Sequence, residues 1–135
     1  MNSQHKQQQQ QGQKKILVID DEPDLTKLCS LAFEEYGFEV DTFNDPIEAL
    51  LNYKPHYYDL VILDIKMPKM DGFQLHNEIK KKDHSAKICF LTASGSFYEE
   101  FRKGEYYVLD KNLFIQKPIS NEELLRKVNK LMTSC

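Results

Sequence analysis

The chain of 135 residues is about one domain long, and its 41% hydrophobic and 29% charged residues are ordinary for a globular protein. This composition excludes collagen-like, coiled-coil and wholly disordered chains, and no apolar run approaches the roughly 18–20 residues of a membrane span. The net charge of −3 is uneven: residues 1–15 hold three of the 18 basic groups and no acid, which leaves 15 basic and 21 acidic groups in residues 16–135. This acidic body argues against direct binding to nucleic acid.

The N-terminal segment differs in kind from the rest of the chain. Seven of the first thirteen residues are glutamine, and no apolar residue lies between Met1 and Ile16. We therefore expect residues 1–14 to be a disordered tail and residues 15–135 to form one domain. The three cysteines show no CxxC spacing, and the N-terminus lacks the apolar stretch of a signal peptide, so a cytoplasmic protein with free thiols is expected.

Short apolar runs alternate with amphipathic segments from residue 15 onward. The run ILVI predicts a strand over 16–19, and a helix is expected over 23–36, ended by Gly37 in the left-handed conformation. Apolar side chains recur along this helix at steps of three and four residues, at Leu25, Leu28, Cys29, Ala32 and Tyr36. An edge strand over 38–43 and a short helix from Pro46 are expected next.

The same alternation continues to the C-terminus. The expected strands cover residues 60–63, 88–91 and 113–116. The expected helices cover residues 73–82 and 96–103, and a last helix opens at the capping box of residues 120–123. Continuous apolar strands that alternate with helices predict a flavodoxin-like (βα)5 fold, a doubly wound parallel sheet with strand order 2-1-3-4-5.

Polar residues follow four of these strands at their carboxyl ends, where open α/β sheets hold their sites. Asp20 and Asp21 follow the first strand, Asp64 the third, Thr92 the fourth and Lys117 the fifth. Each of them alone could serve as a helix cap or a turn residue. Complementary groups at four strand ends of one small fold instead indicate a single site.

These residue types suit phosphoryl chemistry. Three crowded carboxylates repel one another unless a cation neutralises them, and a ligand set made only of oxygens fits Mg²⁺. Lys117 adds a fixed positive charge and Thr92 a hydroxyl, which could stabilise the negative charge of a transferring phosphoryl group. Asp64, alone on the central strand, is the natural nucleophile and would form an aspartyl phosphate.

Four sequence motifs carry a family resemblance: ILVIDDEPD, DLVILDIKMPKMDG, FLTAS and FIQKPI. In this order and at these spacings, residues 15–132 resemble the response-regulator receiver family of two-component signalling. The resemblance implies roles in the pocket for the phosphoacceptor Asp64, for Thr92 and Lys117, and for the Mg²⁺ ligands Asp20, Asp21, Asp64 and the backbone carbonyl of Lys66. It also implies a switch hydroxyl at Thr92, a switch aromatic at Phe114 and two positions that tune the rate of dephosphorylation, Lys66 and Ser94.

The resemblance further implies a mechanism. A sensor histidine kinase would transfer a phosphoryl group from its phosphohistidine to Asp64, Thr92 would move toward that group, and Phe114 would turn inward. The surface formed by the fourth helix, the fifth strand and the fifth helix would then change and bind an unidentified downstream protein. We expect self-phosphorylation and autodephosphorylation rather than multiple-turnover catalysis. We expect no direct binding to nucleic acid or to a membrane.

One segment departs from the family pattern, and two alternatives to a stand-alone receiver stay open. Residues 104–116, GEYYVLDKNLFIQ, replace the usual approach to the fifth strand, either as a packed loop or as a partner-binding surface. The chain could be the receiver portion of a longer regulator or hybrid kinase. It could also be a phosphatase-like enzyme with an aspartate nucleophile, although such enzymes usually carry an acid two residues further on, where this chain has Lys66.

Overall fold

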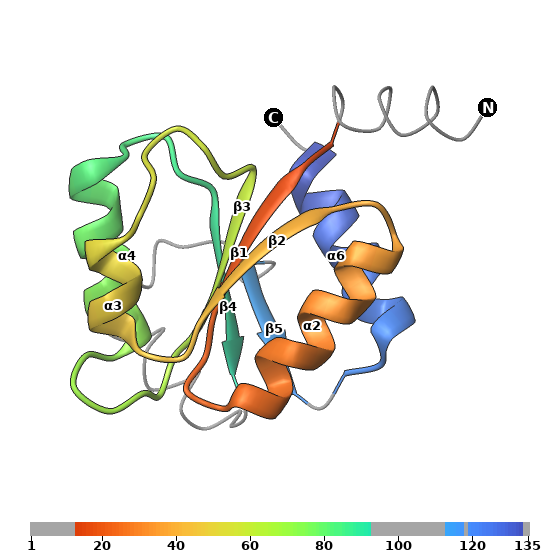
Figure 1. Cartoon of the computed structure of the whole chain (residues 1–135), viewed down its shortest axis with the longest axis horizontal. Helices are drawn as coiled ribbons and strands as arrows, with labels where there is room; N and C mark the ends of the chain where they lie inside the picture. The colour runs from red at the N-terminus through yellow and green to blue at the C-terminus, as the bar shows by residue number, and fades with distance from the viewer. Residues whose placement is uncertain (1–12, 93–112, 118, 134–135) are drawn as a thin grey trace.

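The computed structural model describes residues 13–92, 113–117 and 119–133. Ser94, the helix expected over 96–103, most of the segment 104–116 and nearly all of the Gln-rich tail lie outside these residues. Within the described part, the chain forms one sheet with helices on both of its faces (Figure 1).

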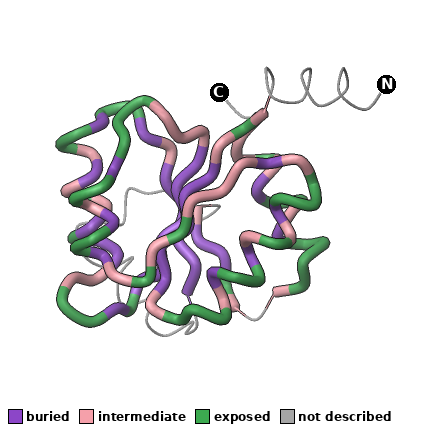
Figure 2. The backbone as a smooth tube through the Cα atoms, viewed as in Figure 1, coloured by how far each residue is buried: buried purple, intermediate pink, exposed green. Residues whose placement is uncertain are grey.

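The sheet has five parallel strands in the order β2-β1-β3-β4-β5, which confirms the predicted topology. The strands are β1 (Lys15–Ile19), β2 (Glu39–Phe43), β3 (Leu60–Asp64), β4 (Ile88–Thr92) and β5 (Phe114–Gln116). Every residue of β3 and β4 is buried, as expected for strands covered on both sides, whereas no residue of the edge strand β2 is fully buried. The fully apolar runs in the sequence therefore mark the centre of the sheet (Figure 2).

Four helices lie in the described part of the chain: α2 (Pro23–Glu35), α3 (Pro46–Leu51), α4 (Gly72–Lys82) and α6 (Asn121–Thr133). Proline opens α2 and α3, and a capping box closes the first turn of α4, in which Asp71 accepts from two backbone N–H groups. The Oγ of Ser120 accepts from the Glu123 N–H at 3.2 Å, so this half of the last predicted capping box is confirmed.

Each face of the sheet carries its own core. On one face α3 and α4 bury Ala49, Phe73 and Ile79 against the strands, and on the other α2 and α6 bury Phe33 and Val128 (Figure 1). The two layers hold the strands from both sides. They leave the carboxyl ends of the strands at one edge, which is where a site can form.

The buried stripe of α2 differs from the predicted one. Leu28 and Tyr36, predicted to face the core, are 57% and 59% exposed, whereas Cys29 is buried as predicted and Thr26 and Phe33 are buried in addition. Thr26 can be buried because its hydroxyl is hydrogen-bonded, with the Pro23 carbonyl as acceptor at 3.1 Å. Hydrophobicity alone does not reveal such a satisfied polar position, so the pattern missed Thr26.

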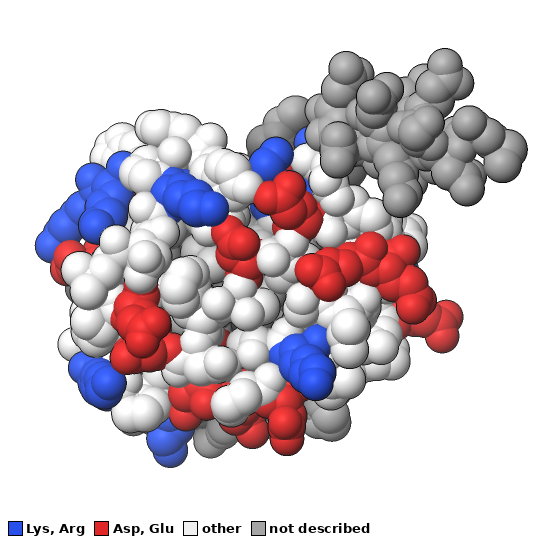
Figure 3. Space-filling model, viewed as in Figure 1, with Lys and Arg blue, Asp and Glu red and all other residues white. Residues whose placement is uncertain are grey.

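Charge is distributed unevenly over the surface seen in Figure 3. Acidic side chains gather over α2 and the neighbouring sheet edge, and a basic group lies over the last turn of α4, which contains Lys80, Lys81 and Lys82. None of the described helices is long and apolar enough to cross a membrane.

Candidate functional site

The carboxyl ends of the strands meet at one edge of the sheet. Because β1 and β3 are neighbours, Asp20, which follows β1, lies beside Asp64, the last residue of β3. Thr92 ends β4 on the other side of β3, and Lys117 follows β5. The Lys117 N–H donates to the Thr92 carbonyl at 2.7 Å, which ties the last two strand ends together. The four strand ends singled out in the sequence therefore lie together at one edge of the sheet.

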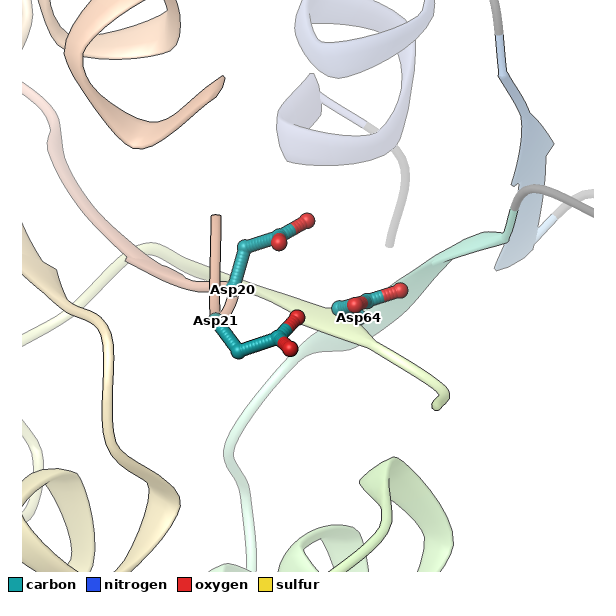
Figure 4. A group of neighbouring side chains, drawn as sticks. All are labelled: Asp20, Asp21 and Asp64. Atoms are coloured by element: carbon teal, nitrogen blue, oxygen red, sulfur yellow. The ribbon is translucent and has the colours of Figure 1, made fainter. Parts of the chain in front are cut away.

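Three carboxylates converge there, from the turn after β1 and from β3 (Figure 4). One oxygen of each of Asp20, Asp21 and Asp64 lies within 4.8 Å of the others. Asp20 and Asp64 are only 1% and 6% exposed, and Asp21 is more open to solvent. The Asp20 Oδ1 accepts from the Glu22 N–H at 2.9 Å, which holds this carboxylate in the turn before α2.

Lys117 lies in the middle of the acidic groups. Its Nζ is 3.0 Å from Asp20 Oδ2, 3.3 Å from Glu22 Oε1 and 3.7 Å from Asp64 Oδ1. The ammonium therefore neutralises part of the negative charge, and its longer distance to Asp64 leaves that carboxylate the least tightly paired of the three.

Burial and neighbouring charges change the titration of these groups. Burial and then the charge of Asp20 raise the pKa of Asp64 from 3.8 to about 7, although Lys117 acts in the opposite direction. Burial also raises the pKa of Asp20, in spite of its bonds to Glu22 and Lys117. Burial alone would lower the pKa of Lys117, but the hydrogen bond and charge of Asp20 and the charge of Asp64 raise it. Among the described residues, the pocket thus holds more negative charge than the Lys117 ammonium compensates.

Asp64→Asn is expected to stabilise the protein when divalent cations are absent. Since the pKa of Asp64 is about 7 in the folded chain and near 3.8 in the unfolded chain, the folded chain binds the proton more tightly, and the free energy of unfolding falls as the pH rises between these values. This pKa difference corresponds to at most about 4 kcal/mol, and relaxation of the folded chain around the buried charge reduces the expected gain to about 1–2 kcal/mol. Urea unfolding at pH 8 in EDTA measures it.

The same comparison at about pH 4 is the control for this prediction. There Asp64 is protonated in the folded chain, so the wild type and Asp64→Asn should have similar free energies of unfolding. Equal stability of the two proteins at pH 8 would contradict the proposed crowding of charge.

The donor set fits a hard divalent cation. All three converging groups are carboxylates, and carboxylate oxygens with room for water are what Mg²⁺ prefers in proteins. A cation held by Asp20, Asp21 and Asp64 would relieve the repulsion that raises the pKa of Asp64.

Comparison with known proteins agrees with this geometry. The family model that describes the response regulator receiver domain matches residues 16–129 of this sequence. The chain belongs to this family. Receiver domains are signalling domains rather than multiple-turnover enzymes. Response regulators act with sensor histidine kinases in two-component systems. An acidic pocket that binds Mg²⁺ is typical of the family.

Curated relatives of this receiver domain include longer regulators. A probable transcriptional regulator, ycf27, of Pyropia yezoensis is 35% identical over 127 residues, which cover 89% of this chain and 51% of the relative. Response regulator ArlR of Staphylococcus aureus is 31% identical over 117 residues, which cover 87% of this chain and 52% of ArlR. The chain thus spans about half the length of these relatives.

Solved structures share the fold. The non-phosphorylated receiver domain of HemR from Leptospira biflexa superposes with a TM-score of 0.77 at 28% identity, covering 91% of this chain and 97% of that one. The response regulator TrrA from Thermotoga maritima, solved in complex with Mg²⁺ and BeF, has a TM-score of 0.70 at 37% identity and covers 87% of this chain and 98% of its own.

The remaining predicted residues of the receiver domain lie in different settings. Thr92 is 3% exposed at the end of β4. Lys66 follows β3 with an exposed side chain, and the role of its carbonyl stays a prediction. Phe114 is 9% exposed, and its ring stacks on Phe90 with the centroids 5.1 Å apart and an interplanar angle of 19°. Ser94 lies outside the described residues.

Three contributors to the site were missed in the sequence. Glu22 binds Lys117, Gly72 packs against the backbone after β3, and the Asn44 amide donates to the Asp20 carbonyl at 2.8 Å. The sequence could have indicated Asn44, because this residue follows β2 and open α/β sheets hold their sites at the carboxyl ends of their strands. The other two contacts depend on side-chain direction and on backbone approach, which spacing does not reveal.

Proposed function

We propose that the chain is the phosphoacceptor switch of a two-component system, which receives a phosphoryl group on Asp64 from the phosphohistidine of a sensor histidine kinase. The observation that carries this proposal is the convergence of Asp20, Asp21 and Asp64 within 4.8 Å, with the ammonium of Lys117 3.7 Å from the Asp64 oxygen. A nucleophilic carboxylate beside other carboxylates and a fixed cation is suited to phosphoryl transfer.

In the transfer step, an oxygen of Asp64 forms the new bond to phosphorus as the bond from phosphorus to the histidine nitrogen breaks, and the nitrogen keeps the electron pair. Lys117 lies close enough to Asp64 to stabilise the negative charge on the phosphoryl oxygens. Thr92, at the end of the neighbouring strand, offers a hydroxyl on the same edge of the sheet. The bonds of Asp20 to Lys117 and to the Glu22 N–H hold that carboxylate in place during the reaction.

The carboxylates of Asp20, Asp21 and Asp64, with the carbonyl of Lys66 as the expected fourth ligand, would hold Mg²⁺. When bound, the ion supplies positive charge that neutralises the acidic pocket and the phosphoryl oxygens. Asp21 is the most exposed of the three carboxylates, and we expect a phosphoryl donor to approach the pocket from its side.

We further propose that phosphorylation is signalled to a downstream protein through the surface of the fourth helix expected over 96–103, of β5 and of α6; the expected fourth helix lies outside the described residues. Thr92 and Phe114 connect the pocket to this surface, because β4 and β5 are paired strands. Phe114 is mostly buried against Phe90, so its ring lies close to the inner position that the proposed switch requires. Lys66 and Ser94 are proposed to tune the lifetime of the phosphoryl group.

The residue two positions after Asp64 argues against a phosphatase-like enzyme. Such enzymes need a general acid near the leaving group, and the position two residues after Asp64 holds Lys66, whose side chain is exposed. We therefore expect negligible turnover of phosphate monoesters.

A longer protein that contains this receiver is the second arrangement we consider. The chain spans about half the length of two of its curated relatives, one of which is named as a probable transcriptional regulator. The mass of the native gene product separates the two arrangements, since a natural stop after Cys135 would exclude the longer one.

Incubation with Mg²⁺ and acetyl phosphate, followed by intact-mass measurement, tests the proposed function. The wild type is expected to gain the mass of one phosphoryl group, and Asp64→Asn is expected to gain none because its side chain is not a carboxylate nucleophile. Asp59→Asn is a matched control, because Asp59 precedes the opposite end of β3 and accepts from the Lys15 N–H at 2.8 Å, far from the pocket. An unphosphorylated wild type, or an adduct retained in Asp64→Asn, would overturn the proposal.

A further inference from the structure

A side chain just after β2 contacts the turn that carries two of the three pocket carboxylates. Asn44 directly follows β2, and its Nδ2 donates to the Asp20 carbonyl at 2.8 Å and to the Thr26 Oγ1 at 2.9 Å. An amide NH₂ has two hydrogens, so one asparagine can make both bonds at once. Asn44 therefore joins the end of β1 to the first turns of α2.

The Thr26 hydroxyl completes a chain of hydrogen bonds. It accepts from Asn44 and donates to the Pro23 carbonyl at 3.1 Å, and the Thr26 N–H donates to the Glu22 carbonyl at 3.2 Å. One hydroxyl can donate once and accept as well, so the bonds are mutually compatible. Thr26 is 3% exposed, and the link is thus anchored at a buried point of the helix.

The group held by Asn44 is the peptide unit between two metal-ligand candidates. The Asp20 carbonyl and the Asp21 N–H belong to the same plane, so a bond to this carbonyl also restrains the direction in which Asp21 leaves the backbone. The Asp20 carboxylate has direct partners in Lys117 and in the Glu22 N–H. Asn44 instead acts on the backbone that orients both carboxylates.

We propose that Asn44, together with Thr26, is a positioning residue that holds the Asp20–Asp21 peptide so that both carboxylates face Asp64. The inference deepens the proposed function and rests on it for the phosphorylation step, but cation binding tests it separately. Weakening the link lets the turn relax away from the crowded pocket, because the carboxylates there repel one another.

The test compares Mg²⁺ dissociation constants by isothermal titration calorimetry on the unphosphorylated chain. Asn44→Ala and Thr26→Val are each expected to raise the dissociation constant about fivefold, the effect of losing about one hydrogen bond. Thr26→Ser keeps the hydroxyl and should retain the wild-type constant. The double substitution Asn44→Ala with Thr26→Val should bind Mg²⁺ about as weakly as Asn44→Ala alone, because both remove the same link.

Asn52→Ala is the matched control. The Asn52 Nδ2 donates to the Glu48 carbonyl at 2.8 Å at the end of α3, the same kind of bond at the same length as that of Asn44. This variant should keep the wild-type Mg²⁺ constant even where its thermal stability falls. A wild-type constant in Asn44→Ala, or an equal rise in Asn52→Ala, would overturn the positioning role.

Phosphorylation by acetyl phosphate at saturating Mg²⁺ provides the second measurement. We expect Asn44→Ala to be phosphorylated more slowly than the wild type even there, because Asp21 and Asp20 are less well oriented. If the wild type itself is never phosphorylated, the proposed function fails, whereas a weakened Mg²⁺ affinity in Asn44→Ala still supports the positioning role. The two failures are thus distinguishable.

Discussion

Lys117→Ala is expected to lower the rate of Asp64 phosphorylation by acetyl phosphate at least about 100-fold at saturating Mg²⁺, the usual effect of removing one charged or hydrogen-bonding group from a transition state. The Lys117 Nζ lies 3.7 Å from Asp64 Oδ1 and 3.0 Å from Asp20 Oδ2, so the substitution removes the cation that lies beside the proposed phosphoacceptor. It also leaves the buried Asp20 carboxylate without its ammonium partner. Intact mass at timed intervals measures the rate.

Lys69→Ala is the control for this experiment. Lys69 forms an exposed ion pair with Asp45 at 3.1 Å in the loop before α4, and its removal should change the phosphorylation rate less than about twofold. Calorimetric Mg²⁺ titration of Lys117→Ala shows whether the acidic pocket persists. A variant that binds Mg²⁺ and is phosphorylated at the wild-type rate would contradict the role assigned to Lys117.

Gly72→Ala is expected to have the largest effect on stability, a loss of about 3 kcal/mol at the upper end of the range for overpacking. A Cβ at this position would overlap the Asp64 carbonyl oxygen and lie 2.9 Å from the Ile65 Cα. Both are backbone atoms, and the Gly72 N–H donates to the Ile65 carbonyl at 2.7 Å, so neither side moves easily. Because the displaced backbone carries Asp64, the proposed phosphoacceptor, Mg²⁺ binding should weaken as well. Urea unfolding and calorimetry measure the two effects.

Gly37→Ala separates this packing effect from backbone conformation. Gly37 has φ +101°, the left-handed region that favours glycine, and no atom lies within 4 Å of the place its Cβ would take. Its substitution should lower the free energy of unfolding by about 1–2 kcal/mol through strain and leave Mg²⁺ affinity unchanged. If Gly72→Ala were as mild as Gly37→Ala and retained Mg²⁺ affinity, the close approach at Asp64 would not matter for the site.

The strands were predictable because parallel strands covered on both faces need continuous apolar runs. Residues 60–63 and 88–91 were predicted as strands, and the structure extends each by one residue, to Asp64 and Thr92. The helix ends were predictable where a proline or a capping box marked them. The predicted inward face of α2 was wrong in part: Cys29 is buried as predicted, but Leu28 is 57% exposed and the satisfied hydroxyl of Thr26 is buried.

The candidate site was predictable for a topological reason. Parallel strands end at the same edge, so acids after β1 and β3 had to lie near the lysine after β5 once the strand order was known. The sequence did not predict the distances between these side chains. That Lys117 pairs more closely with Asp20 than with Asp64 depends on the side-chain positions in the folded chain.

The sequence by itself determined the family, the strand order and the residue types gathered at the edge of the sheet, because hydrophobic pattern and chain order govern which elements are buried and which neighbour each other. The tertiary structure alone decided how these residues are held: Asn44 on the Asp20 carbonyl, Gly72 against the backbone of Asp64, and a pKa of about 7 for Asp64. Each of these depends on distances of a few ångströms between segments that are far apart in the chain. The excess of acidic residues in the sequence includes Asp20, Asp21 and Asp64, which form a pocket only when folding brings them together.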